Sequence, residues 1–134
     1  MKFSYIVKSK LGSDKNLIPN QRSDFFNAQH QLSDGEEVVW VDCLRDYPFL
    51  KYEVFDQVEK AFSDYGNILD RGHAHEKNVR LGTKKLPLDS VEGQIALVYG
   101  YKLGDSVFRR VSPVCNILVW AGLCTHMPGA LKKN

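Results

Sequence analysis

The stretch from residue 50 to residue 65 constrains the fold of this chain more than any other. Its apolar residues recur every three or four positions and form one stripe along a helix, while the charged residues lie largely outside that stripe. Gly66 follows where a helix can end, because glycine adopts the left-handed conformation at little steric cost. Such a helix normally packs its stripe on a sheet, so we expect a sheet in the same domain. The stripe consists of Val54, Phe55, Val58, Ala61, Phe62 and Tyr65.

The first half of the chain is expected to supply two strands and a second helix. Period-two alternation predicts a strand over residues 2 to 8, followed by a loop over 11 to 16 that is rich in turn formers. A proline suited to a first helical position, followed by apolar residues at helical spacing, predicts a helix over about 19 to 32, which Asp34 and Gly35 end. β-Branched and aromatic residues predict a strand over 37 to 43.

The second half is expected to be mostly strand. Residues 67 to 92 are the least regular part, with a short strand proposed at 77 to 81. Alternation on both sides of Gly104 and Asp105 predicts a hairpin of 95 to 101 with 106 to 111, which pairs Tyr101 with Phe108 and Tyr99 with Arg110. A run of Val, Ile, Leu and Trp predicts a central strand over 114 to 124, and residues 125 to 134 resemble a loose tail.

These elements predict a single globular α+β domain over residues 1–134, with a mainly antiparallel sheet and two helices packed on one face. A chain of 134 residues has the ordinary size of one domain. It contains no repeat, low-complexity tract or linker that would divide it. Trp40, Trp120 and the aromatic residues of the predicted hairpin suit a sheet edge or a dimer face as readily as a core, so a homo-oligomer is left open.

Several functional classes are disfavoured by what the sequence lacks. No apolar run approaches the roughly 18 residues that cross a bilayer, and the start is too short and too alternating for a signal peptide, so we expect a cytoplasmic protein without membrane contact. Cys43, Cys115 and Cys124 lack CxxC spacing and are expected to be reduced. No phosphate loop, dinucleotide fingerprint or nucleophile elbow is present, so no cofactor is expected.

Charge is unevenly distributed along the chain although the formal net charge is only +2. Acidic residues outnumber basic ones over residues 32 to 65, and the balance reverses from residue 66 onward. We therefore expect an acidic side and a basic side. The leading functional hypothesis is a small binding or regulatory module that contacts a protein or a nucleic acid through these two surfaces.

A candidate catalytic cluster lies at residues 71 to 80. In an extended backbone His73 and His75 share one face, where a neutral and a protonated imidazole can exchange protons near neutral pH. Arg71 and Arg80 are suited to hold a phosphate. The alternative hypothesis is therefore a small nuclease-like hydrolase, with Glu76 as orienter or second base.

Alternate side chains of an extended strand point to opposite faces, so Glu76 would lie opposite the two histidines. This weakens the catalytic hypothesis, because only a bend in the backbone could bring Glu76 to the same side. A metal interpretation would add Glu76 or Asp70 as a third ligand, but an HxH pair is a weak signal, and we predict no metal site. An ordinary exposed loop remains the third alternative.

Anion binding is expected from basic side chains, some of which interleave with aromatic residues as they do in single-stranded nucleic-acid platforms. The competing interpretation is that the aromatic face forms core. The predicted anion-binding residues are Lys77, Lys84, Lys85, Lys102, Arg109 and Arg110.

Overall fold

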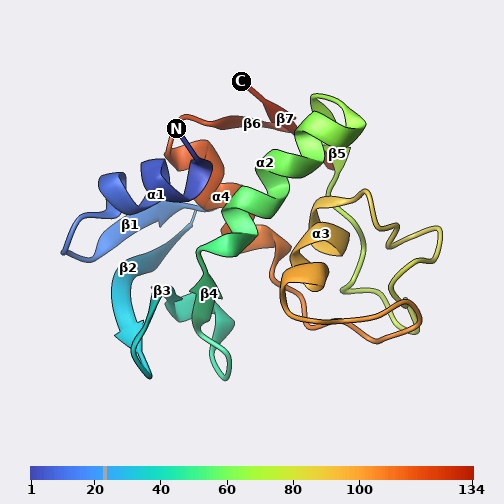
Figure 1. Cartoon of the computed structure of the whole chain (residues 1–134), viewed down its shortest axis with the longest axis horizontal. Helices are drawn as coiled ribbons and strands as arrows, with labels where there is room; N and C mark the ends of the chain where they lie inside the picture. The colour runs from blue at the N-terminus through green and yellow to red at the C-terminus, as the bar shows by residue number, and fades with distance from the viewer. Residues whose placement is uncertain (23) are drawn as a thin grey trace.

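The computed structural model describes residues 1–22 and 24–134, and it has an α+β architecture (Figure 1). The described residues form four α-helices, one 3-10 helix, and two antiparallel sheets of four and three strands. Helix α2 crosses the middle, with α1 and the larger sheet on one side and α3 on the other. The elements are α1 Phe3–Leu11, β1 Asn16–Pro19, β2 Phe25–Ser33, β3 Glu36–Val41, η1 Asp42–Leu44, β4 Phe49–Lys51, α2 Glu53–Tyr65, β5 Ile68–Asp70, α3 Val91–Val98, α4 Val111–Trp120, β6 Cys124–Met127 and β7 Ala130–Lys133.

The helix predicted over residues 50 to 65 is confirmed as α2 from Glu53 onward, while residues 50 and 51 belong to β4. The strand predicted over 37 to 43 is confirmed as β3 up to Val41, after which η1 begins. The apolar stripe of α2 is buried as expected, except for Tyr65 at its end, which is exposed. Gly66 ends the helix with a φ of 111°, and its N–H donates to the carbonyl oxygen of Phe62. None of the described helices has the length and apolarity needed to cross a membrane.

The strand predicted over residues 2 to 8 is wrong, because this segment is helix α1. Phe3, Val7 and Leu11 are buried four residues apart, which is the helical spacing. Carboxylates of α2 satisfy the free donors at the start of α1: the N–H of Phe3 donates to Glu59, and the N–H and hydroxyl of Ser4 donate to Asp56. A tertiary contact therefore favours the helix over the local alternation.

The helix predicted over 19 to 32 is also wrong, and Ser23 within that range lies outside the described residues. Residues 16 to 19 and 25 to 33 form β1 and β2, in the sheet order β1-β2-β3-β4. Phe26 and Ala28, two residues apart, are both buried in the core. The burial in β2 therefore follows the two-residue period of a strand rather than the spacing of a helix. Asp34 and Gly35 do end it, as predicted, and both have positive φ, as two-residue hairpin turns require.

The predicted hairpin of 95 to 101 with 106 to 111 and the predicted central strand over 114 to 124 are wrong. These segments contain the helices α3 and α4. Both helices are buried on most sides, so they lack the polar face whose period distinguishes a helix from a strand. Two predicted cross-strand neighbours nevertheless meet, because the Arg110 guanidinium lies 3.7 Å from the centre of the Tyr99 ring.

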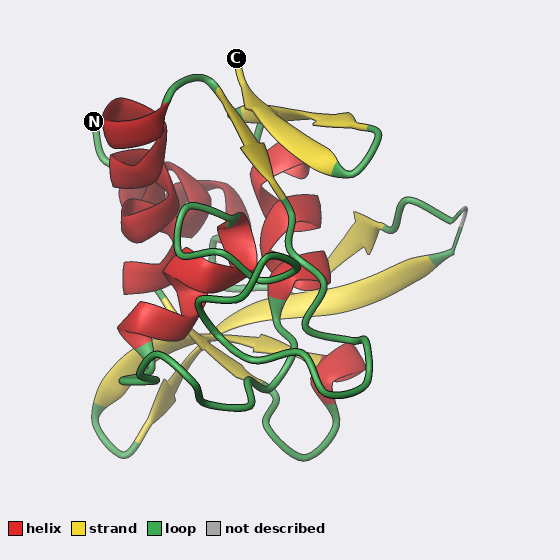
Figure 2. Cartoon of the chain, turned by 90° about the vertical axis from the view of Figure 1, so that its right-hand side faces the viewer, coloured by secondary structure: helices red, strands yellow, loops and turns green. Residues whose placement is uncertain are grey.

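Two further predictions concern irregular segments. No strand forms over residues 77 to 81, and the chain from 71 to 90 is an irregular loop that Figure 2 shows in green, spread over the helices. Leu81 and Leu86 anchor this loop in a small apolar cluster with Ala96. The loose tail is wrong too, because β7 pairs with both β5 and β6 and Leu131 is fully buried.

Gly93 in α3 provides a test of how closely α3 packs on the preceding loop. A Cβ at this position would overlap the carbonyl oxygen of Pro87 and lie 3.0 Å from Ser90 Oγ. Replacing a helical glycine with alanine ordinarily stabilises by about 0.8–1.0 kcal/mol. Here we expect Gly93→Ala to lower the free energy of unfolding by roughly 1–3 kcal/mol, as overpacking does. Urea unfolding with an unchanged m-value measures this, and a stabilised variant would contradict the packing.

Candidate functional site

An open pocket of about 620 Å³ lies between the β1–β2 turn, the segment around η1 and the start of α4. Four arginines line it, from four separate parts of the chain. Asp46 is the one acidic residue among the described residues of the lining. The pocket therefore concentrates positive charge although the chain as a whole is nearly neutral. The arginines are Arg22, Arg45, Arg71 and Arg109.

Two of these arginines converge on a single hydroxyl. Arg71 Nη2 lies 3.3 Å and Arg109 Nη2 lies 3.1 Å from Ser112 Oγ. Across residues 1–22 and 24–134, neither guanidinium has a carboxylate within salt-bridge distance. Arg71 Nη1 is buried and has no hydrogen-bond partner among these residues. A phosphate or carboxylate group next to Ser112 would satisfy both cations, because guanidinium donors match the geometry of such oxygens.

The remainder of the wall adds an unusual backbone and an aromatic ring. Arg45 follows η1 with a φ of 45°, a conformation that non-glycine residues rarely adopt and that is often kept at binding sites. Phe108 lines the pocket, and its ring contacts Tyr47 edge to face, with the ring centres 5.0 Å apart. Tyr47 is 60% exposed, so the aromatic pair is open to solvent beside the arginines.

A buried carboxylate holds this wall together. Glu92 is fully buried in α3, and its Oε1 accepts hydrogen bonds from the N–H groups of Arg110 and Val111 at the start of α4. Its own N–H donates to the carbonyl oxygen of Arg71. One residue therefore fixes the two backbone segments that carry Arg71 and Arg109 to the pocket.

Burial raises the pKa of Glu92 from its ordinary value of 4.5 to about 7, against the lowering effect of the hydrogen bonds from Arg110 and Val111 and of the nearby guanidinium groups. Oε2 is buried and has no hydrogen-bond partner in the described chain. Because Glu92 has no exposed surface, it acts on the pocket through the backbone rather than by contact with a ligand.

The cysteines do not provide a nucleophile at this site. Cys43 lines the pocket, but partial removal from water and the neighbouring Asp42 raise its pKa to about 11, so its thiol is uncharged near neutral pH. Cys115 and Cys124 are buried, whereas Cys43 is exposed. All three are free thiols.

A second hollow, of about 340 Å³, has the opposite charge. Glu36, Glu37, Glu53 and Asp56 line it, and Lys8 lies among them, with its ammonium 2.8 Å from Glu37. The two hollows therefore differ in the charge of their linings. The division does not follow the two halves of the sequence, because Arg22 and Arg45 of the pocket come from the first half.

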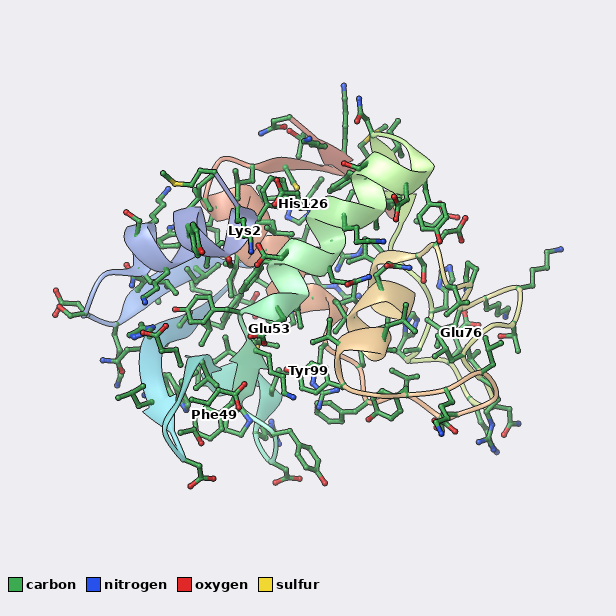
Figure 3. All side chains as sticks on the ribbon, viewed as in Figure 1. Lys2, Phe49, Glu53, Glu76, Tyr99 and His126 are labelled. Carbon is green, nitrogen blue, oxygen red and sulfur yellow. The ribbon has the colours of Figure 1, made fainter. Side chains whose placement is uncertain are left out.

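The predicted cluster at 71 to 80 is brought together only in part. His73, His75 and Glu76 offer ligand atoms that all lie within 4.8 Å of one another. The extended backbone assumed for this segment is wrong: the Glu76 N–H donates to the carbonyl oxygen of His73, closing a turn that carries Glu76 to the histidines' side. Figure 3 shows Glu76 in the long loop, well away from the larger sheet that contains Phe49. Lys85 donates to Glu76 at 2.6 Å and holds the pKa of this carboxyl below its usual range.

The other predicted site residues are dispersed. Arg71 lies in the pocket, whose described lining contains neither histidine, and Arg80 is exposed on the loop. Arg109 is the one predicted anion-binding residue in the pocket lining, whereas Arg110 is buried against Tyr99 and Phe108. The remaining predicted residues, Lys77, Lys84, Lys85 and Lys102, are exposed on loops.

Sequence reasoning missed most of the pocket lining. Arg22, Arg45 and Ser112 carry no local motif, and they meet only when the sheet packs beside α4. No protein-family model, curated protein sequence or solved structure matches the chain, so this site has to be interpreted from its own chemistry.

The raised pKa of Glu92 predicts a pH-dependent stability. Between about pH 4.5 and pH 7 the folded protein binds this proton while the unfolded chain has released it, so the contribution is full at lower pH and is lost as pH rises through about 7. Glu92→Gln removes the effect and keeps an acceptor for the N–H groups of α4. We expect the wild type to lose on the order of 3 kcal/mol relative to the variant between about pH 4 and about pH 8.

Denaturant unfolding of both proteins across this range measures the difference. The loop residue Glu76 provides the matched control, because Glu76→Gln should change the pH profile much less. A constant difference between wild type and Glu92→Gln would show that the pKa of Glu92 is the same in the folded and the unfolded protein.

Proposed function

We propose that this protein is a nucleic-acid-binding module that holds the phosphate backbone of a single strand in the arginine-lined pocket. The observation that carries the proposal is the convergence of Arg71 and Arg109 on Ser112, without a carboxylate partner among the described residues. Two guanidinium groups that share one neutral oxygen repel each other. An anionic group would reverse this repulsion.

Phosphate suits the pocket better than an acidic protein side chain. Arg22 and Arg45 add two further guanidinium groups to the lining, so successive phosphates of one strand would meet several cations. The aromatic pair of Phe108 and Tyr47 offers a surface for a base beside those phosphates. A base next to a phosphate is the repeating unit of a nucleic acid, and single strands leave the base free to stack.

The pocket is tested with Arg109→Ala. Because Arg109 is exposed, its replacement should leave the fold intact while removing one charge-assisted hydrogen bond to phosphate, worth about 1.5–3 kcal/mol. We expect the Kd for short labelled single-stranded RNA or DNA to rise roughly tenfold to a hundredfold, measured by fluorescence anisotropy. The slope of log K against log salt should decrease by about 0.7 for each phosphate that the variant no longer neutralises.

Arg80→Ala is the matched control, since Arg80 is an exposed arginine outside the pocket lining that the structure describes. The Kd of Arg80→Ala for the same single strands should stay within a factor of about two of the wild-type value, as expected for a side chain that does not contact a phosphate. Binding that does not depend on salt would favour a protein partner. Equal weakening of binding by Arg109→Ala and Arg80→Ala would show that the pocket is not the binding site.

A small nuclease is the second candidate, supported by the turn that gathers His73, His75 and Glu76. The expected result is cleavage of RNA or DNA by the purified protein, slowed roughly a hundredfold or more by His75→Ala, because general acid–base catalysis is lost. Absence of cleavage, or an active His75→Ala protein, would eliminate this candidate and leave the binding proposal unaffected.

A further inference from the structure

The turn at residues 73 to 76 also gathers side chains whose chemistry suits a metal ion. Its two imidazoles and one carboxylate offer three ligand atoms within 4.8 Å of one another. The imidazole ring centres are 5.7 Å apart. Imidazole nitrogen and carboxylate oxygen are ligands of Zn²⁺, whereas Mg²⁺ and Ca²⁺ favour oxygen alone.

The spacing is close to that of a metal site. Ligand atoms around a tetrahedral Zn²⁺, with bonds of about 2.0–2.1 Å, lie about 3.3 Å from one another. The three atoms must therefore approach by up to about 1.5 Å, which is within the reach of side-chain rotation. Both histidines are exposed, so neighbouring side chains do not fix their rotamers.

The backbone and one neighbour organise these three side chains. The His73 N–H donates to the carbonyl oxygen of Lys85 at 2.9 Å, and the turn bond from Glu76 to His73 measures 3.2 Å. Lys85 Nζ lies 2.6 Å from Glu76 Oε2 and holds this carboxylate by an outer hydrogen bond. Carboxylates that bind metals are commonly held by such outer hydrogen bonds.

We infer that His73, His75 and Glu76 form a three-ligand Zn²⁺ site, with a fourth position open to water. The site is distinct from the arginine pocket, because none of its three residues is among the described lining of that pocket. In an extended strand Glu76 would point away from the two histidines, which disfavoured this site. The turn instead places Glu76 beside them.

The test uses the full chain without a histidine tag. Isothermal titration with Zn²⁺ should give one ion per chain, and Co²⁺ should give the visible absorption of a tetrahedral complex. His75→Ala removes a direct ligand, so its Kd should rise by at least the roughly 10–100-fold that removal of an outer partner already costs. Glu76→Gln should weaken binding while leaving the protein folded, because Glu76 lies on a surface loop.

His30→Ala is the matched control, because the His30 imidazole lies elsewhere, 2.8 Å from the Tyr52 hydroxyl. It should bind Zn²⁺ as the wild type does, and thermal unfolding checks that all variants are folded. Absence of Zn²⁺ binding by the wild type, or equal weakening in His30→Ala and His75→Ala, would overturn the site. Arg109→Ala should keep full Zn²⁺ affinity, so failure of the nucleic-acid proposal and failure of the metal site are distinguishable.

Discussion

The buried carboxylate of Glu92 is the interaction on which the basic side of the molecule depends. Its Oε1 receives the first N–H groups of α4, and its backbone N–H holds the carbonyl oxygen of Arg71. The free donors of a helix start attract a negative or polar acceptor, so this pairing is favourable even where burial opposes charge. Glu92 thereby ties together the backbone segments that carry Arg71 and Arg109.

A similar arrangement of carboxylates is found at the start of α1. The start of α1 is capped by Asp56 and Glu59 of α2, a helix far away in sequence. In both places a carboxylate on one helix accepts hydrogen bonds from the start of another. The same contact therefore caps one helix and packs the two helices together. The capped start of α1 borders the acidic hollow, and the capped start of α4 borders the arginine pocket. Each of the two hollows therefore lies beside a helix start that a carboxylate caps.

The elements that the sequence predicted correctly have a clear polar and apolar division. Helix α2 has one buried stripe and an opposite charged face, and β3 is rich in β-branched and aromatic residues. The segments of helices α3 and α4 were predicted as strands because both helices are buried on most sides. They therefore have no polar face that would reveal the helical periodicity in the sequence. The prediction for α1 was wrong for a different reason. Its apolar and polar residues alternate as in a strand, and the carboxylates that cap it as a helix come from α2.

The sequence by itself determined the mixed α+β class, the central amphipathic helix, and which residues carry useful chemistry. Arg71, Arg109 and the two neighbouring histidines were all identifiable from their side chains. Only the tertiary structure decided their grouping: Arg71 joins Arg109 at Ser112, while a turn brings Glu76 to His73 and His75. The physical reason is that side-chain chemistry is local, whereas the convergence of charges is set by long-range packing and by single backbone hydrogen bonds.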